Sequence, residues 1–253
     1  MIGDAQGVAD IFCVHNQRAM TLVLKAKGCP WFVLLLAAVF VQAQTRPATT
    51  PIAESQVLTV SNASFPVDVL VESPAATKTD LQAICLFQSD PSHTFHGSLM
   101  EIDQKLDGLL SQVHKSNLFS GALGETLLIA PKPGTIPAGR LLLIGLGELE
   151  SFTPEREQQV GFIFFEEAER LGISHPYFAP TVLDGGKTGT DTGDVAQQFL
   201  SGFLHAKASQ DLLKNAGVSA GASPRSLTYL AGPKHAADTR DGLARAFKTM
   251  PTH

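Results

Sequence analysis

Short apolar runs alternate with longer segments of helical period from Gln56 to the end of the chain. Strands that alternate with helices along a chain are typical of an α/β fold. Seven runs of four to seven residues are expected strands: Val57–Val60, Val67–Val71, Ala83–Phe87, Thr126–Ala130, Arg140–Leu146, Tyr177–Leu183 and Leu227–Ala231. Leu127–Ile129 and Leu141–Ile144 are apolar at every position, which predicts that both are central strands covered on two faces.

Helix start signals precede the segments of helical period. Ser98 and Glu101 have the spacing of a capping box, and the apolar stripe that follows predicts one helix reaching Val113. A second helix is expected to begin at the Thr-Pro-Glu sequence that starts at Thr153 and to end at Gly172. Two further helices are expected after residue 194 and near residue 238.

An apolar run of eleven residues, Trp31–Val41, lies before this region. It is shorter than the roughly 20 residues that a membrane-spanning helix needs. Two lysines precede it and small residues end it, so residues 1–43 are expected to be a signal peptide cleaved after Ala43, with Met20 as an alternative start. An uncleaved anchor helix is the other interpretation. We expect an exported protein, periplasmic or extracellular, without a stable membrane span after cleavage.

The region after the predicted cleavage site divides into two parts. Residues 44–55 are rich in Pro, Thr and Ala and predict a disordered linker. Residues 56–253 are expected to form one α/β domain. The net charge of -5 gives no basic excess to neutralise a phosphate backbone, so we expect no nucleic-acid partner. Cys85 is the one cysteine left, and its apolar surroundings predict a buried, unreactive thiol.

Familiar cofactor motifs are incomplete in this sequence. Gly185–Thr188 resembles the end of a phosphate-binding loop, but the first glycine of that pattern is missing, which favours a mobile surface loop over residues 184–194. Gly145 and Gly147 follow a strong strand, yet Glu150 stands where a dinucleotide fingerprint needs its third glycine. The histidines are scattered and no serine-nucleophile motif occurs. We therefore expect no cofactor, no metal site and no catalytic residue.

Glycines at the ends of two expected strands are the candidate binding residues. In α/β folds, ligands usually bind at the carboxyl ends of the strands. Glycine lets the backbone come close to a ligand, and its amide can face an anion. If a small ligand binds, we expect it near Gly121, Gly124, Gly145 and Gly147. The alternative is that these glycines serve only tight turns and packing.

The stretch from Asp80 to Phe247 resembles the amino-terminal domain of the leucyl aminopeptidase (cytosol aminopeptidase) family. The resemblance is carried by FSGALGETLLI at residues 119–129, RLLLIGLGE at residues 140–148 and the helix that opens at Thr153. It implies a macro-domain-like fold, in which a mixed sheet lies between helices.

The resemblance stops before the family's catalytic domain. That domain holds two divalent metals and carries an Asn-Thr-Asp-Ala-Glu-Gly-Arg type of signature, which this sequence lacks. We therefore expect an exported, non-catalytic binding or assembly module, with a small ligand, a protein partner or a second copy of itself as the bound species. One alternative is a part of a metal-dependent aminopeptidase whose catalytic domain is on another chain or missing from the gene model. The second is a macro-like domain that binds a nucleotide or ADP-ribose.

Overall fold

The computed structural model describes residues 56–62, 65–88 and 94–249. The chain divides into two units, Met1–Pro51 and Ile52–His253, and all of the described residues belong to the second. The predicted signal peptide and linker, residues 1–55, lie outside the described residues.

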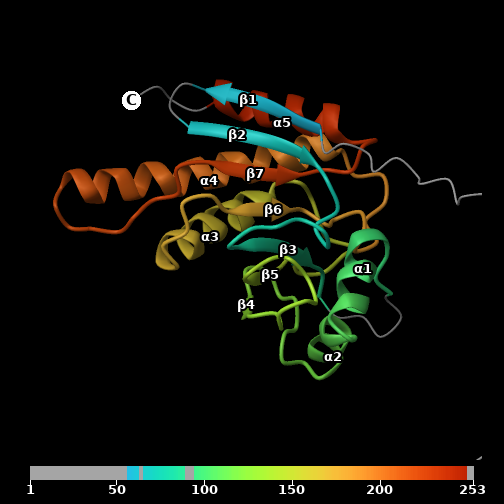
Figure 1. The fold of residues 1–253 in the computed structure, drawn as a ribbon. Helices are drawn as coiled ribbons and strands as arrows, with labels where there is room; N and C mark the ends of the chain where they lie inside the picture. The colour runs from blue at the N-terminus through green and yellow to red at the C-terminus, as the bar shows by residue number, and fades with distance from the viewer. Residues whose placement is uncertain (1–55, 63–64, 89–93, 250–253) are drawn as a thin grey trace, which may run out of the picture. The chain divides into compact units, whose positions relative to one another are not determined.

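All seven expected strands form one mixed sheet, which confirms the predicted fold class (Figure 1). The order across the sheet is β1-β2-β7-β6-β3-β5-β4. The two outer pairs, β1 with β2 and β4 with β5, are antiparallel, and the five inner strands are parallel. The strands are β1 (Gln56–Asn62), β2 (Phe65–Val71), β3 (Gln82–Leu86), β4 (Thr126–Ile129), β5 (Leu141–Gly145), β6 (Tyr177–Ala179) and β7 (Leu227–Leu230).

Helices cover both faces of the sheet and create two cores (Figure 1). On one face, apolar residues of α3, α4 and α5 pack against Ala83 and Cys85 of β3. On the other face, α1 and α2 pack against Ile84 and Leu86 of the same strand. Successive residues of β3 thus enter opposite cores, as the pleat of a strand requires. The helices are α1 (Gly97–Lys105), α2 (Leu109–Lys115), α3 (Arg156–Arg170), α4 (Thr192–Asn215) and α5 (Ala236–Thr249).

The prediction that Leu127–Ile129 is a central strand is wrong. It belongs to β4, which lies at the edge of the sheet and pairs with β5 alone. Thr126 and Leu128 are exposed, whereas Leu127 and Ile129 are half-buried against the α1 and α2 side. By contrast, Leu141–Gly145 is buried throughout, as expected for a strand with a neighbour on each side and helices on both faces.

The predicted capping box and single helix are also corrected. Ser98 donates its amide and its hydroxyl to the Asp184 carboxylate, and Glu101 accepts a hydrogen bond from the loop after β2. The helix breaks at Asp107 and Gly108, whose φ angles of 55° and 79° are left-handed. The apolar stripe therefore continues across two short helices, α1 and α2, instead of one.

Two helices on one face approach each other closely because glycines stand at their crossing. A Cβ at Gly161 of α3 would lie 2.0 Å from the Phe199 oxygen, and one at Gly202 of α4 would lie 1.8 Å from the Gln158 oxygen. Beneath them, Phe178 of β6 stacks on Phe199 with ring centroids 3.7 Å apart. Any side chain at either glycine would separate α3 from α4 and open this aromatic core.

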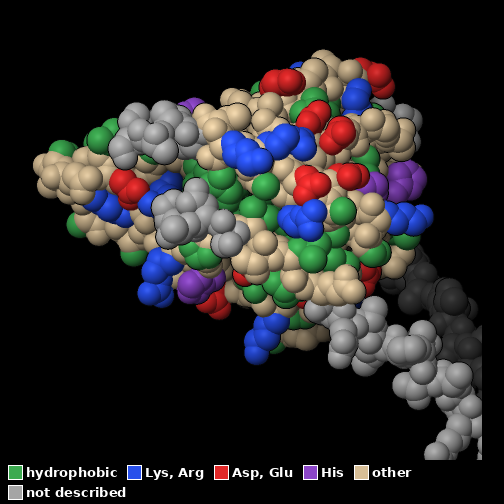
Figure 2. Space-filling view, turned by 90° about the horizontal axis from the view of Figure 1, so that it is seen from above, with side chains coloured by type: hydrophobic (Ala, Val, Ile, Leu, Met, Phe, Trp, Pro, Cys, Tyr) green, Lys and Arg blue, Asp and Glu red, His purple; other side chains and the backbone are tan. Residues whose placement is uncertain are grey.

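The surface that carries β1 and α5 mixes basic and acidic side chains (Figure 2). Arg245 of α5 pairs with Asp194 of α4 at 2.9 Å, and Arg240 pairs with Asp241 at 2.7 Å. This face therefore shows no field of a single sign. Among the helices that the structure describes, none is long and apolar enough to cross a membrane.

Candidate functional site

A cleft of about 860 Å³ lies at the carboxyl ends of three neighbouring strands. Val71, Ala179 and Leu230 are the last residues of β2, β6 and β7, and all three line it. Because these strands are parallel neighbours, their carboxyl ends meet at one edge of the sheet. The volume is in the range of small-molecule sites, which is about 300–1,000 Å³.

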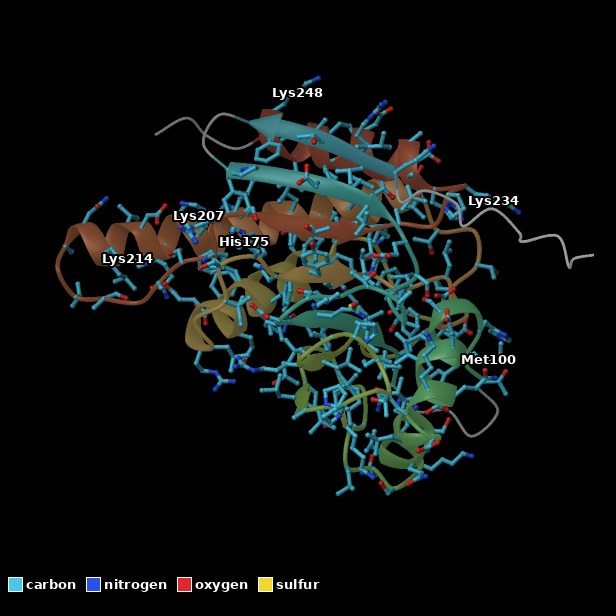
Figure 3. All side chains as sticks on the ribbon, in the orientation of Figure 1. Met100, His175, Lys207, Lys214, Lys234 and Lys248 are labelled. Carbon is cyan, nitrogen blue, oxygen red and sulfur yellow. The ribbon has the colours of Figure 1, made fainter. Side chains whose placement is uncertain are left out.

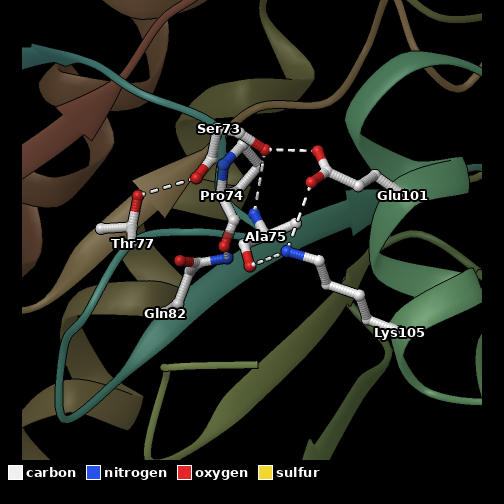
Figure 4. A network of polar contacts seen from close by, with 7 residues as sticks. All are labelled: Ser73, Pro74, Ala75, Thr77, Gln82, Glu101 and Lys105. Carbon is white, nitrogen blue, oxygen red and sulfur yellow. Dashed lines mark hydrogen bonds and ion pairs between the residues drawn. The ribbon is translucent and has the colours of Figure 1, made fainter. Parts of the chain in front are cut away.

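The loop that follows β2 forms one wall of the cleft, and a network of polar contacts holds this loop in place (Figure 4). The Ser73 hydroxyl donates to the Glu101 carboxylate at 2.6 Å, and Lys105 pairs with the same carboxylate at 3.3 Å. From below, the Gln82 side-chain amide donates to the Pro74 oxygen at 3.0 Å. The loop is thus tied to α1 and to β3, which gives this wall a fixed shape.

The loop that follows β6 forms a second wall and is tied to β3 and α1. The Thr181 hydroxyl accepts from the Cys85 amide at 2.9 Å and donates to the Cys85 oxygen at 2.7 Å. Thr181 has a φ of 50°, a left-handed conformation that is unusual for threonine. Further along, the Asp184 carboxylate accepts from Ser98 at the start of α1, and the Asp184 oxygen accepts from the His96 amide.

The first residue of α4, Thr192, supplies a polar group without a hydrogen-bond partner. Its hydroxyl oxygen is buried and has no partner among the described residues, and Thr192 lines the cleft. The orphan amides at the start of α4 are satisfied by Asp191, whose carboxylate accepts from Gly193 at 2.8 Å and from Asp194 at 3.0 Å. A buried hydroxyl without a partner is costly.

The four predicted binding glycines come together at the end of β5, away from the strands that bear the cleft. Gly121, Gly124 and Gly147 have left-handed φ angles of 77°, 82° and 75°. A Cβ at Gly145 would lie 2.0 Å from the Ala122 oxygen. Turn geometry and close backbone packing therefore account for these glycines, and ligand binding at them stays a prediction.

The amides of these glycines are used within the protein. Gly124 donates to the Gly145 oxygen at 3.0 Å, and Gly145 donates to the Glu125 oxygen at 2.8 Å. Gly147 donates to the Gly121 oxygen at 2.9 Å. A ligand would need other donors here, or would have to displace these bonds.

The Glu125 carboxylate fills the concave turn of backbone amides beside these glycines. It accepts from the Ser120 amide at 2.9 Å, from the Ser120 hydroxyl at 2.6 Å and from the Ala122 amide at 3.2 Å. Partial burial of Glu125 acts to raise its pKa, but these bonds, with one from the Gly121 amide, outweigh it and leave the pKa below its usual value. The turn that could receive an external anion thus already holds one.

Three titratable groups share the core between the sheet and α3. Glu157 in the first turn of α3 is fully buried, and neither carboxylate oxygen has a hydrogen-bond partner among the described residues. Burial raises the pKa of Glu157 well above its usual range. Burial is the main cause that raises the pKa values of Cys85 and Tyr229. Cys85 is buried, as expected, and its raised pKa keeps it as a thiol rather than the reactive thiolate.

No group of three or more His, Cys, Asp or Glu side chains in the described part of the chain is placed to hold a metal ion.

The family match agrees with the fold. The profile of the cytosol aminopeptidase family, N-terminal domain, matches residues 84–216, which is more than half of the chain, and the chain belongs to this family. A probable cytosol aminopeptidase of Thermosynechococcus vestitus is 33% identical over 132 residues, covering 50% of this chain and 24% of the relative. One of Burkholderia thailandensis is 36% identical over 76 residues, or 30% of this chain and 14% of the relative. The chain thus spans about a quarter or less of the length of these relatives.

Solved structures place the fold with macrodomains. A macrodomain mutant of Oceanobacillus iheyensis has a TM-score of 0.55 at 11% identity, covering 81% of this chain and 98% of its own. A mutant of tomato leucine aminopeptidase has a TM-score of 0.52 at 20% identity, covering 72% of this chain and 36% of its own. These likenesses show that this chain has the fold of macrodomains, which also forms part of the leucine aminopeptidase.

Proposed function

We propose that this chain is a binding domain without catalytic activity of its own, and that the cleft at the ends of β2, β6 and β7 is its binding site. The cleft is the observation that carries the proposal. Its walls are fixed by hydrogen bonds to α1 and β3, and apolar residues such as Val182, Val195 and Leu230 dominate its lining. A preformed, mostly apolar cavity with a few polar groups is the usual form of a small-molecule site.

Blocking the cleft tests this proposal. Gly232 lines the cleft, its φ is not left-handed, and the nearest contact of an added Cβ would be His235 at 3.9 Å. Gly232→Phe therefore fills space without straining the backbone. Fragments that bind the wild-type protein in a ligand-observed NMR screen should lose binding in Gly232→Phe and keep it in Gln112→Phe, an exposed position on α2. Fragments that bind both variants equally would place the binding site elsewhere.

The lack of catalysis is supported by the part of the family that the chain matches. The match is to the N-terminal domain, and the family's metal-binding signature is missing from the sequence. The purified protein, given manganese or zinc, should not release leucine from leucyl-amide above a buffer control. Metal-dependent turnover that persists through repeated purification would contradict the proposal.

A second candidate function is one part of a metal-dependent aminopeptidase whose catalytic domain is on another polypeptide. The short coverage of the relatives supports it, since three quarters of the Thermosynechococcus vestitus protein lies outside the match. In that case the chain would assemble with a protein partner or a second copy of itself. Pull-down of the tagged chain from its native source should then recover leucyl-amide hydrolysis, and an inactive eluate would count against this candidate.

A nucleotide or ADP-ribose ligand is a third candidate. A macrodomain of Oceanobacillus iheyensis has been solved with ADP, and it shares the fold of this chain at 11% identity. A likeness of fold alone supports this candidate, because ligands are selected by the residues of a site.

Export to the periplasm or the extracellular space is proposed from residues 31–43, where an apolar run is followed by small residues. Amino-terminal sequencing of the mature protein should begin near Gln44. An intact Met1 or Met20 on intracellular protein would contradict export.

A further inference from the structure

The charged side chains that line the cleft are acidic. Glu72, directly after β2, and Asp184, in the loop after β6, both line it. Among the described residues that line it, none is Lys or Arg, and His235 is the basic side chain present. Lys234 adjoins this lining in sequence, but it is exposed and its side chain extends outward at the edge of the molecule (Figure 3). The field in the cleft therefore favours a cation over an anion.

The two carboxylates are not equally available. Asp184 accepts the amide and the hydroxyl of Ser98 at the start of α1, where the positive helix end also offsets its charge. Glu72 accepts one hydrogen bond, from the Thr77 hydroxyl at 2.9 Å, and its other oxygen has no partner among the described residues. A carboxylate offers about four lone-pair positions, so Glu72 keeps most of its capacity.

Backbone amides that would suit a phosphate are already occupied near the cleft. The start of α1 is capped by Asp184, and the start of α4 is capped by Asp191. A helix start is a natural anion site because its amides point outward unpaired. With both filled by carboxylates of the chain itself, neither helix start offers free donors to a phosphate.

Uncharged polar side chains also line the cleft and suit a hydrogen-bonding ligand of any charge. Thr190, Thr192 and Thr239 are among them, and a threonine hydroxyl can both donate and accept a hydrogen bond. The surrounding surface is mostly apolar, which suits a hydrophobic body.

We propose that the cleft binds an organic amine with an apolar body, with its ammonium group paired to Glu72 and its body against the apolar wall. Phosphate-bearing ligands are rejected by the same carboxylates. This inference rests on the proposed function, that the cleft is the binding site, and adds the chemical class of the ligand.

Calorimetric titration of the protein with four probes tests the chemical class of the ligand. Tryptamine carries the ammonium group, indole-3-ethanol replaces it with a hydroxyl, indole-3-propionate carries a carboxylate, and ADP-ribose carries phosphates. Tryptamine should bind about tenfold tighter than indole-3-ethanol, as expected for a partly desolvated charge pair. Indole-3-propionate and ADP-ribose should bind more weakly than either.

Two matched variants test whether Glu72 supplies the negative charge that pairs with the ammonium group. Glu72→Gln keeps an oxygen that accepts from Thr77 but removes the charge, so the preference for tryptamine over indole-3-ethanol should fall to about threefold or less. Glu166→Gln makes the same change at an exposed position of α3 and should leave the preference unaltered. An unaltered preference in Glu72→Gln would overturn the placement of the ammonium group.

The outcomes separate this inference from the proposed function. Equal binding of tryptamine and indole-3-ethanol, lost in Gly232→Phe, would overturn the ligand class and keep the cleft as the site. ADP-ribose binding tighter than tryptamine would overturn the class in favour of the nucleotide candidate. Binding of none of the probes, together with no fragment sensitive to Gly232→Phe, would overturn both.

Discussion

Glu157→Gln should make the protein less sensitive to rising pH. The Glu157 side chain is fully buried with both oxygens unpartnered among the described residues, and burial raises its pKa well above its usual range. The folded protein therefore keeps a proton that the unfolded chain releases at about pH 4.3. The stability that depends on neutral Glu157 is fully present below that pH. It is lost as the pH rises toward the pKa of Glu157 in the folded protein.

The size of the effect follows from proton linkage. While Glu157 is neutral in the folded state and ionised in the unfolded state, the free energy of unfolding falls by about 1.4 kcal/mol per pH unit. Between about pH 5 and about pH 7 the loss reaches about 2.7 kcal/mol if the folded side chain stays neutral throughout. Glutamine has the same size and cannot ionise, so Glu157→Gln should escape this loss.

Urea denaturation of both proteins across this pH range measures the difference. The free energy of unfolding of Glu157→Gln relative to wild type should increase with pH, with a slope of about 1.4 kcal/mol per pH unit. Glu166→Gln, exposed on the same helix, should show no such slope. A difference between Glu157→Gln and wild type that does not vary with pH would refute the claim that Glu157 is buried in the neutral form.

Three further predictions concern packing and the turn beside β5. Gly145→Ala should cost about 1–3 kcal/mol of unfolding free energy in urea denaturation, because its Cβ would lie 2.0 Å from the Ala122 oxygen; wild-type stability would contradict that contact. Phe178→Ala should cost about 3–5 kcal/mol, since the fully buried ring stacks on Phe199, and a loss under 1 kcal/mol would show a looser core. Glu125→Gln should destabilise the protein at neutral pH, and the gap should close as pH falls through the lowered pKa of Glu125, whereas a gap that is constant with pH would argue against the anionic contacts.

Local sequence patterns predicted the strands better than their positions in the sheet. Leu141–Ile144 and Leu127–Ile129 are equally apolar, yet the first lies in a central strand and the second in an edge strand. The difference comes from the order of the strands, which depends on contacts between distant segments. Ser98 shows the same limit of local patterns. Its spacing from Glu101 predicts a capping box, but in the structure Ser98 bonds the carboxylate of Asp184, which is 86 residues away.

The cleft lies at the carboxyl edge of the sheet, the edge at which the sequence predicts binding, but beside other strands than the glycines. The sequence predicts ligand binding at the carboxyl ends of parallel strands, and its four glycines place the predicted site at the end of β5. The cleft instead lies where β2, β7 and β6 end, and nothing local shows that these three strands are neighbours. A signal was present: Pro74, Pro180 and Pro233 each follow one of these strands closely, and all three line the cleft.

A crystal structure of the protein with tryptamine would show whether an amine binds in the cleft at Glu72. The indole ring should lie against the apolar wall of the cleft, with the ammonium nitrogen within about 3 Å of the Glu72 carboxylate. Tryptamine bound instead at the turn formed by Gly121, Gly124 and Gly145, with the cleft empty, would contradict this placement.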